Sequence, residues 1–448
     1  MKLFKSFPIF ILLPLFVCSA TAQEKLWSLE QCIDYALENN IDIKSGEYNT
    51  QLKEQSLSTS KWSRLPDLNA SIRQGLSFGR TENMQTHAYD PKNATSTQFN
   101  ISANMPIFTG FRISNEIEAA KLDVQASLES LNRAKESLAI LVTSNYLNVL
   151  FNKELENVQQ AQADLSAEQL SKTEILVQSG KVSESQLYDA KALLAKDELN
   201  LVNAQNEVKL SLLSLVQNLE LGTQVETFRV TDPQLDDPTQ TLLGSLMTPN
   251  EIYSIAVATR PMIKEQELLL ESSRKQLKVA KAGYYPTLNL SASYGSGYAY
   301  YLNDDNPYSF ADQWNNSNRT NMEVTLSIPI FNRFQVRNSV NTSKINILNQ
   351  GLSLDKSKKD LFDEIQKAYY NAVAAQRKYE SSKESVEAST VSYKYVQEKY
   401  DVGKASVFEL NEAKVKMVQS QSEQVQSKYE FIFRTKILDF YRGVKITL

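Results

Sequence analysis

The feature that most constrains this chain is an internal duplication. The segment Lys61–Ser71 (KWSRLPDLNAS) shares a Lys, a Pro, a Leu-Asn pair and a Ser with Lys281–Ser291 (KAGYYPTLNLS), at a constant offset of 220 in the numbering. Further on, Met105–Phe111 (MPIFTGF) matches Ile328–Phe334 (IPIFNRF) at an offset of 223. Self-similarity over such a distance indicates that one structural unit occurs twice.

A third match fixes the extent of the two repeats. Gly180-Lys181-Val182-Ser183 corresponds to Gly403-Lys404-Ala405-Ser406, again at an offset of 223, so the three additional residues fall in a loop between the first and second matches. We expect repeats over 23–221 and 248–448, joined by a linker at 222–247 that is rich in Pro and Asp.

Each repeat is expected to begin with a helix and continue with strands. The helices are predicted over 28–62 and 249–282, and each ends shortly before a proline, Pro66 or Pro286, that cannot continue it. Two β-hairpins, 67–106 and 286–330, follow, because their apolar and polar residues alternate with period 2. The apolar members are Leu68, Ala70, Ile72, Leu76, Phe78, Phe99, Ile101, Ala103, Met105, Leu288, Leu290, Ala292, Tyr294, Met322, Val324, Leu326 and Ile328.

The same alternation occurs in soluble sandwiches, so further observations must distinguish a membrane barrel. The segments are near the ~9 to 11 residues that cross a tilted bilayer, and polar loops rich in Asn, Asp and Ser separate them. Aromatic residues gather near both ends, as in interfacial girdles. They are Phe78, Tyr298, Tyr300 and Tyr301 at one end, and Tyr284, Tyr285, Phe108 and Phe331 at the other.

After Pro106 and Pro329 the period changes from 2 to 3.5, which predicts long helices with a heptad seam. No proline occurs over the segment 334–401, so one helix there would be about 100 Å long. The seam residues are Ile365, Ala368, Ala372, Ala375, Tyr379, Ser382, Val386, Ser389, Tyr393, Val396 and Tyr400.

The Gly-Lys segments read as the turns of helical hairpins. Gly180 and Gly403 are expected to end the long helices, and Ser183 and Ser406 are expected to cap the helices that return over about 184–219 and 407–441.

The N-terminus predicts export. Two lysines precede an apolar stretch over 7–17, and Ala20-Thr21-Ala22 reads as a cleavage site, so 1–22 is expected to be a signal peptide. Lipidation at Cys18 is disfavoured because Val17 precedes it in place of a small residue. Beyond residue 22 no apolar stretch is long enough to cross a bilayer as a helix, so we expect no membrane-spanning helix.

The residue inventory argues against an enzyme and against a nucleic-acid partner. His87 is the only histidine and Cys32 the only cysteine after the signal peptide, and neither has an evident partner for nucleophilic or zinc chemistry. We therefore predict no catalytic residue, no metal site and no cofactor. The charge is balanced, with 48 Lys+Arg against 52 Asp+Glu, whereas a nucleic-acid partner requires a concentrated basic face.

Four amphipathic strands cannot close a barrel, because known barrels have at least about 8. Two chains would supply 8 strands, three 12 and four 16, and an open conduit requires three or more chains. A periplasmic coiled-coil stalk without a pore is the rival hypothesis, but such a stalk has no use for four alternating strands placed symmetrically in two repeats.

The paired segments at Pro66 and Pro286, the paired Pro-Ile-Phe junctions at Pro106 and Pro329, and the paired Gly-Lys turns resemble those of the TolC-like outer-membrane efflux protein (outer membrane factor) family. The resemblance covers essentially the whole chain after the signal peptide. It implies a mixed, mainly α fold with long antiparallel coiled-coil-like helical hairpins and four transmembrane β-strands per chain. A trimer would complete a 12-stranded barrel and an α-helical tunnel in the outer membrane of a Gram-negative bacterium, with a large periplasmic part.

The resemblance also implies a function and partners. Such a homotrimer is a passive exit duct of a tripartite efflux or type I secretion system, set in outer-membrane lipid and served by a periplasmic adaptor (membrane fusion) protein and an inner-membrane pump. Drug, metal and protein cargo remain alternatives, because the adaptor and pump choose the cargo.

Two groups of site residues carry over from the family. The adaptor-docking tips are Gly180, Lys181, Val182, Ser183, Gly403, Lys404, Ala405 and Ser406. The acids of the periplasmic aperture fall on Glu409 and Glu412, for which the first repeat offers Gln186 and Asp189. Some relatives have an Arg that locks the closed mouth where this chain has Ala405, which puts that lock in doubt.

Overall fold

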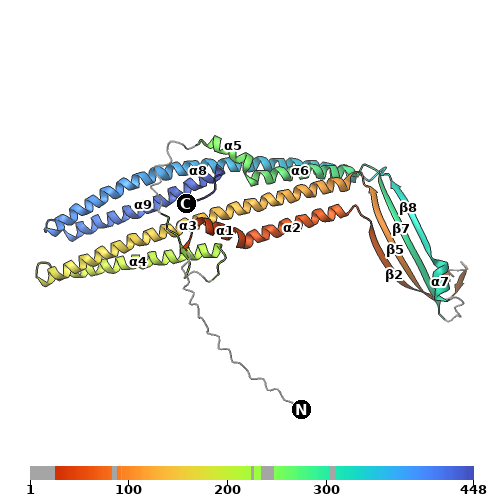
Figure 1. Cartoon of the computed structure of the whole chain (residues 1–448), viewed down its shortest axis with the longest axis horizontal. Coiled ribbons are helices and arrows are strands. Elements are labelled where there is room, and N and C mark those ends of the chain that lie inside the picture. The colour runs from red at the N-terminus through yellow and green to blue at the C-terminus, as the bar shows by residue number, and fades with distance from the viewer. Residues whose placement is uncertain (1–25, 83–87, 92, 223–226, 234–246, 303–308) are drawn as a thin grey trace, which may run out of the picture. The chain divides into compact units, whose positions relative to one another are not determined.

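The computed structural model describes residues 26–82, 88–91, 93–222, 227–233, 247–302 and 309–448 (Figure 1). The predicted signal peptide, His87 and most of the predicted linker lie outside them. The chain divides into two compact units. Unit one holds the residues up to Tyr35, Val142–Asp236 and Leu448, and unit two holds Ala36–Leu141 and Asp237–Thr447.

Eight of the described helices form four pairs of equal length, as the duplication of the sequence predicts. The pairs are α1 (Leu29–Asn39) and α5 (Pro249–Thr259) with 11 residues, α2 (Ile41–Trp62) and α6 (Pro261–Ala282) with 22, α3 (Arg112–Gln178) and α8 (Gln335–Asp401) with 67, and α4 (Glu184–Asn218) and α9 (Val407–Tyr441) with 35.

The prediction of one continuous helix at the start of each repeat was wrong. The first is interrupted at Asn40, whose extended backbone and side-chain oxygen, accepting from the Asp42 and Ile43 N–H groups, begin α2. The second is interrupted at Arg260 (φ −73°, ψ 128°), because the following Pro261 disfavours a helical conformation in the residue before it. Both interruptions end α1 or α5 after 11 residues.

The heptad prediction for the second repeat is confirmed. α8 packs against α9 along the predicted seam, where Ile365, Ala372 and Tyr379 are buried. Nearer the turn the seam includes a hydroxyl pair, because the Ser389 hydroxyl lies 2.5 Å from that of Ser420. Leu410 and Met417 of α9 are also buried in this part, so apolar packing continues towards the turn beside the hydroxyl pair.

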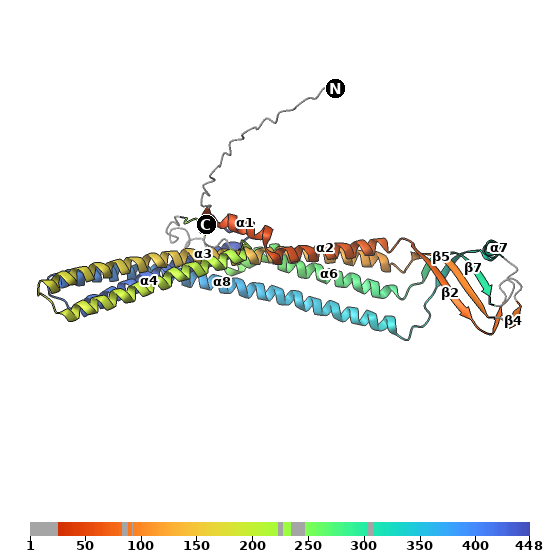
Figure 2. The same cartoon turned by 90° about the horizontal axis from the view of Figure 1, so that it is seen from below.

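In unit one the corresponding part of α3 lies beside α4 in both views (Figures 1 and 2). The Gln162 amide and the Ser166 hydroxyl of α3 donate to the buried Asp197 carboxylate of α4. The short parallel strands β1 (Leu26–Trp27) and β6 (Arg229–Val230) also belong to this unit.

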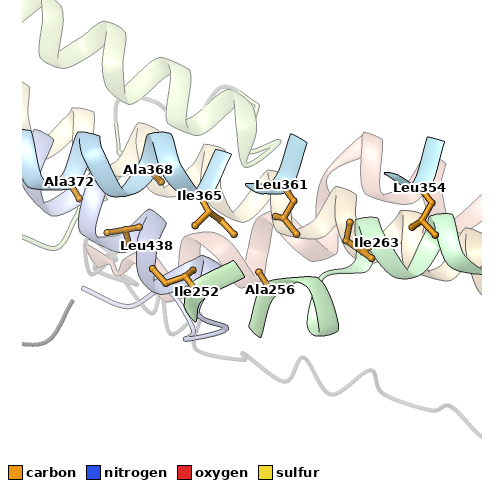
Figure 3. Close-up of a cluster of buried hydrophobic side chains, with 9 residues drawn as sticks. All are labelled: Ile252, Ala256, Ile263, Leu354, Leu361, Ile365, Ala368, Ala372 and Leu438. Carbon is orange, nitrogen blue, oxygen red and sulfur yellow. The ribbon is translucent and has the colours of Figure 1, made fainter. Parts of the chain in front are cut away.

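A cluster of buried side chains joins four helices of unit two (Figure 3). Such burial stabilises a fold by about 1.5–3 kcal/mol for each large aliphatic side chain. The cluster consists of Ile252 and Ala256 of α5, Ile263 of α6, Leu354, Leu361, Ile365, Ala368 and Ala372 of α8, and Leu438 of α9.

The four predicted strands form one antiparallel sheet in the order β2 (Asp67–Ser77), β5 (Ala94–Phe108), β7 (Thr287–Tyr301) and β8 (Arg319–Ser327). The first inter-strand loop adds a small hairpin of β3 (Arg80–Glu82) and β4 (Tyr89–Pro91). The second was expected to be only a polar loop, which was wrong. It contains α7 (Phe310–Ser317), which begins at a capping box between Ser309 and Asp312.

The pairing register separates the side chains of the sheet onto two faces. Residues directly opposite each other in neighbouring strands share a face, and Ile72, Phe99 and Ser296 form one such row. The apolar face collects Leu68, Ala70, Ile72, Leu76, Phe99, Ile101, Ala103, Met105, Leu288, Leu290, Ala292, Tyr294, Met322, Val324 and Leu326. The polar face collects Asn69, Ser71, Arg73, Gln98, Asn100, Ser102, Asn104, Ser291, Ser293, Asn321, Glu323 and Thr325.

None of the described helices combines the length and the apolar character needed to cross a bilayer.

Candidate functional site

The two predicted hairpin tips have the same turn. In each, the glycine is left-handed, with φ of 69° at Gly180 and 75° at Gly403. The Gly180 N–H donates to the Val177 carbonyl, and the next N–H, that of Lys181, donates to the Leu176 carbonyl, both at 2.9 Å. This pair of bonds is a Schellman motif, which satisfies the last carbonyls of a helix. The predicted role of Gly180 in ending α3 is therefore confirmed.

The second tip repeats the motif bond for bond. The Gly403 N–H donates to the Tyr400 carbonyl at 2.9 Å, and the Lys404 N–H donates to the Lys399 carbonyl at 2.7 Å. No atom lies within 4 Å of where a Cβ would stand on Gly180 or Gly403, so the left-handed backbone, and not space, requires glycine at these turns.

The starts of the two returning helices differ. Ser406 forms a capping box with Glu409, in which the Glu409 N–H donates to the Ser406 hydroxyl oxygen at 3.2 Å. In return the Glu409 carboxylate accepts from the Ser406 N–H at 2.7 Å. Ser183 is extended like Ser406, but its side chain makes no capping bond, and Gln186 stands where the second tip has Glu409. The predicted N-cap position is confirmed for both serines, but only Ser406 caps its helix with its side chain.

The capping box sets the electrostatics of Glu409. The backbone N–H and the hydroxyl of Ser406 both donate to its carboxylate, and these bonds hold its pKa below the usual value. Glu409 is thus ionised and tied to the start of its own helix. Glu412 is exposed one turn further along α9 and shares that helix face.

In the first tip, Asp189 is exposed and Gln186 partly buried. Because the tip at 180–183 belongs to unit one and the tip at 403–406 to unit two, the two groups of predicted residues are features of separate units. Within each tip the lysine and the capping serine are exposed, whereas Val182 and Ala405 are partly buried.

Sequence reasoning missed large apolar side chains beside both tips. Phe408, in the first turn of α9, is 76% exposed, and Tyr188, in the second turn of α4, is 67% exposed. Val402 and Ile175 are exposed just before the turns. An aromatic residue within one or two turns of a predicted tip glycine was the available signal. These side chains give each tip an exposed apolar surface with an exposed lysine in the turn.

Among the described residues, no group of three His, Cys, Asp or Glu side chains is placed to hold a metal ion. Cys32 is buried, and this burial raises the pKa of its thiol to about 12, so the thiol stays protonated at neutral pH.

Comparisons with known proteins agree with this architecture. The family model described as "Outer membrane efflux protein" matches residues 32–219 and 252–432. The chain is 22% identical over 306 residues to outer membrane protein TolC of Escherichia coli, an alignment that covers 66% of this chain and 59% of TolC. It is 19% identical to the outer membrane efflux protein BepC of Brucella suis, over 89% of this chain and 81% of BepC.

The fold is the same as that of CusC. The crystal structures of CusC are described in terms of folding and transmembrane channel formation. CusC superposes with a TM-score of 0.78 over 93% of this chain and 92% of CusC, at 16% identity.

Proposed function

Because this chain belongs to the outer membrane efflux protein family, we propose that it is the passive exit duct of a tripartite efflux or type I secretion system. In this proposal an inner-membrane pump and a periplasmic adaptor deliver the cargo, and the duct conducts it across the outer membrane to the exterior. Relatives such as TolC and BepC are outer membrane proteins, and this chain shares that location.

The observation that carries the proposal is the two-faced sheet with two free edges. Among the described strands, β2 pairs only with β5 and β8 only with β7, so both outer strands have unpaired backbone groups. In lipid, such groups must find partners, and only a closed barrel provides them. Three copies would close 12 strands, with the apolar face towards lipid and the polar face lining the conduit.

Exposed apolar residues on the helices support an assembly of several copies. Ile345, Leu348 and Leu352 follow one another at spacings of three and four residues on α8, and each is more than half exposed. A stripe of this spacing is a helix-packing surface. In the proposed trimer, the helices of a neighbouring copy cover it and complete an α-helical tunnel.

The tips are proposed to dock the adaptor. The apolar side chains of Phe408 and Tyr188, with Lys404 and Lys181 beside them, offer the partner both burial and charge. Glu409 and Glu412, with Asp189 and Gln186 of the first repeat, are proposed to line the periplasmic aperture. Rings of like charge in a narrow mouth favour cations. The proposed duct has no catalytic residue, and it needs no cofactor and no resident metal.

The proposal is tested on the full-length protein after extraction from membranes with detergent. Native mass spectrometry should give a trimer, and planar bilayers containing that trimer should show discrete cation-selective conductance steps. A monodisperse monomer, or a species that salt alone washes from membranes, would overturn the proposal.

A further inference from the structure

The antiparallel sheet is incomplete on one side beside α7. β8 pairs with β7 only from Thr287 to Gly295, although β7 continues to Tyr301. Beyond Gly295, the side chain of Gln313 takes the place of a strand. Its amide oxygen accepts from the Ala299 N–H at 2.9 Å, and its amide nitrogen donates to the Ala299 carbonyl at 3.0 Å. The edge of β7 is thus covered by α7.

The aromatic residues of α7 lie on the apolar face of the sheet. The centre of the Trp314 ring lies 5.2 Å from the centre of the Phe99 ring, and the centre of the Phe310 ring lies 5.4 Å from that of Tyr298. The Ser296 hydroxyl donates to the Trp314 carbonyl at 2.9 Å. Phe99, Ser296 and Tyr298 all belong to the rows of the apolar face, so α7 lies over that face and not over the polar one.

Covering the edge of β7 does not explain why α7 has exposed aromatic and polar side chains. Gln313 alone supplies the strand-like bonds, yet Phe310 remains 52% exposed. Asn315 and Asn316 are exposed as well, so the surface of α7 is partly aromatic and partly polar. Tyr300 and Phe78 are also exposed near this end of the strands. Aromatic side chains with neighbouring polar groups are typical of the boundary between lipid headgroups and acyl chains.

The position of α7 along the strands determines which boundary it would meet. The helices attach at the opposite end of the sheet, where α2 precedes β2 and α3 follows β5 (Figure 2). With the helices in the periplasm, the α7 end of the sheet is the external one. On the apolar face, Phe99 and Tyr298 contact the aromatic rings of α7. The rows of this face nearest that end of the sheet also contain the polar residues Gln74, Thr95 and Thr97.

We propose that α7 is an interfacial anchor, which places Phe310 and Trp314 in the headgroup–acyl boundary of the outer leaflet and fixes the depth of the sheet in the membrane. This inference rests on the proposed function, because it takes the apolar face to be the lipid-facing side of a barrel. The partner is a lipid surface, and a second copy of the chain is the competing occupant.

The test uses tryptophan quenching in the full-length protein. The chain has three tryptophans, so Trp27→Phe with Trp62→Phe leaves Trp314 as the reporter. The protein is reconstituted into phosphatidylcholine vesicles whose acyl chains carry bromine either near the headgroup or near the chain end. We expect shallow bromines to reduce Trp314 emission by at least about twofold, and deep bromines to reduce it less, as for a side chain in the interface.

Two controls separate this inference from the proposed function. In a chain whose three native tryptophans are replaced by Phe, Ile72→Trp reports on the middle of the apolar face and Asn100→Trp on the middle of the polar face. The proposed barrel requires bromines, mainly deep ones, to quench the first reporter and to leave the second unchanged.

If Ile72→Trp is quenched and Trp314 is not, the anchor is overturned and the barrel stands; a second copy covering α7 would give that result. If Ile72→Trp is not quenched either, the proposed function fails and the anchor fails with it. Phe310→Ser should lower the shallow quenching of Trp314, whereas Asn316→Ser, a matched change at a polar position of α7, should leave it unchanged.

Discussion

The two repeats have the same backbone plan, but they stabilise it with different polar chemistry. Asn40 and Arg260 occupy equivalent places, where the first helix of each repeat is interrupted. Asn40 caps α2 with its own side chain, whereas Arg260 points elsewhere. Its guanidinium donates to the Glu136 carboxylate at 2.9 Å and to the Phe440 carbonyl, and it lies 3.8 Å from the centre of the Phe440 ring.

The seams of the two helical hairpins also differ in the polar groups that they pair. Ser166 and Asp197 of the first hairpin correspond in the sequence repeat to Ser389 and Ser420 of the second. The first pair joins a hydroxyl to a buried carboxylate, and the second joins two hydroxyls. One backbone position therefore accepts either a local cap, as at Asn40, or a long-range ion pair, as at Arg260. Equivalent substitutions in the two repeats should therefore have unequal effects wherever the partners differ.

The largest effect is expected where the repeats agree. Gly180→Pro and Gly403→Pro should each abolish efflux while membrane insertion persists, because proline cannot adopt a positive φ and removes the N–H of the Schellman motif. Susceptibility of a strain to exported compounds measures this. Gly443→Pro is the matched control, because Gly443 (φ 82°) ends α9 with the same pair of bonds away from the tips. Normal efflux in both tip variants would exclude docking there.

The next largest effect is a difference in stability between substitutions at the two helix interruptions. Arg260→Ala should destabilise the protein by about 3–5 kcal/mol, because the partly buried Glu136 carboxylate loses its partner. Asn40→Ala, the loss of a cap, should cost about 1 kcal/mol. Chemical unfolding followed by circular dichroism compares the two, and equal losses would contradict this account of Arg260.

The Arg260 variant also has a defined pH dependence. Burial raises the pKa of Glu136, against the opposing effect of Arg260. A carboxyl with a raised folded-state pKa favours folding while it is protonated, and this contribution is lost as pH rises through that pKa. Without Arg260 the pKa should rise further. The stability deficit of Arg260→Ala should therefore shrink as pH is lowered from about 7 to about 4.5.

A smaller difference is expected at the seams. Asp197→Ala removes the acceptor of the Gln162 amide and the Ser166 hydroxyl in a buried site, and should cost about 2–3 kcal/mol. Ser420→Ala removes one neutral hydroxyl pair and should cost about 1 kcal/mol. Asp197→Ser, which introduces the residue of the second repeat, should be less destabilising than Asp197→Ala. Equal destabilisation by the two substitutions would show that the two seams are not interchangeable.

The smallest effect is expected at the starts of the returning helices. Glu409→Ala should fray the first turn of α9, seen as faster amide exchange there, whereas Gln186→Ala should leave α4 unchanged because its cap is not formed. Glu409→Gln retains a side chain that can complete the capping box. Glu409→Gln combined with Glu412→Gln is therefore the suitable test of cation selectivity. An unchanged reversal potential in planar bilayers would place the aperture elsewhere.

Much of the fold follows from periodicity and repetition. The four strands, the α8 seam and the left-handed glycines were predicted because each depends on local pattern or local backbone geometry. The helix interruptions at Asn40 and Arg260 were not predicted, although an N-cap residue and a proline are present there in the sequence. The Ser309–Asp312 capping box that begins α7 was likewise present in the sequence and overlooked.

Other features could not be predicted from one sequence. The Arg260 contacts join residues 124 and 180 positions apart, which no local pattern specifies. The caps at Ser183 and Ser406 differ because only the Ser406 hydroxyl accepts from a backbone N–H of the first turn of its helix. At the tips the glycine geometry could be predicted. The position of Phe408 close to a tip glycine was visible in the sequence, but its exposed fraction depends on how α8 and α9 pack.

The two free edges of the sheet also determine what happens to the chain before it reaches its destination. Among the described strands of a single copy, the outer edges of β2 and β8 have no strand partner, and the sheet has an apolar face. In water such strands pair with any available edge, which is the route to aggregation. In the proposed barrel, strands of other copies complete these edges, so folding and subunit assembly are coupled and the apparent stability depends on chain concentration.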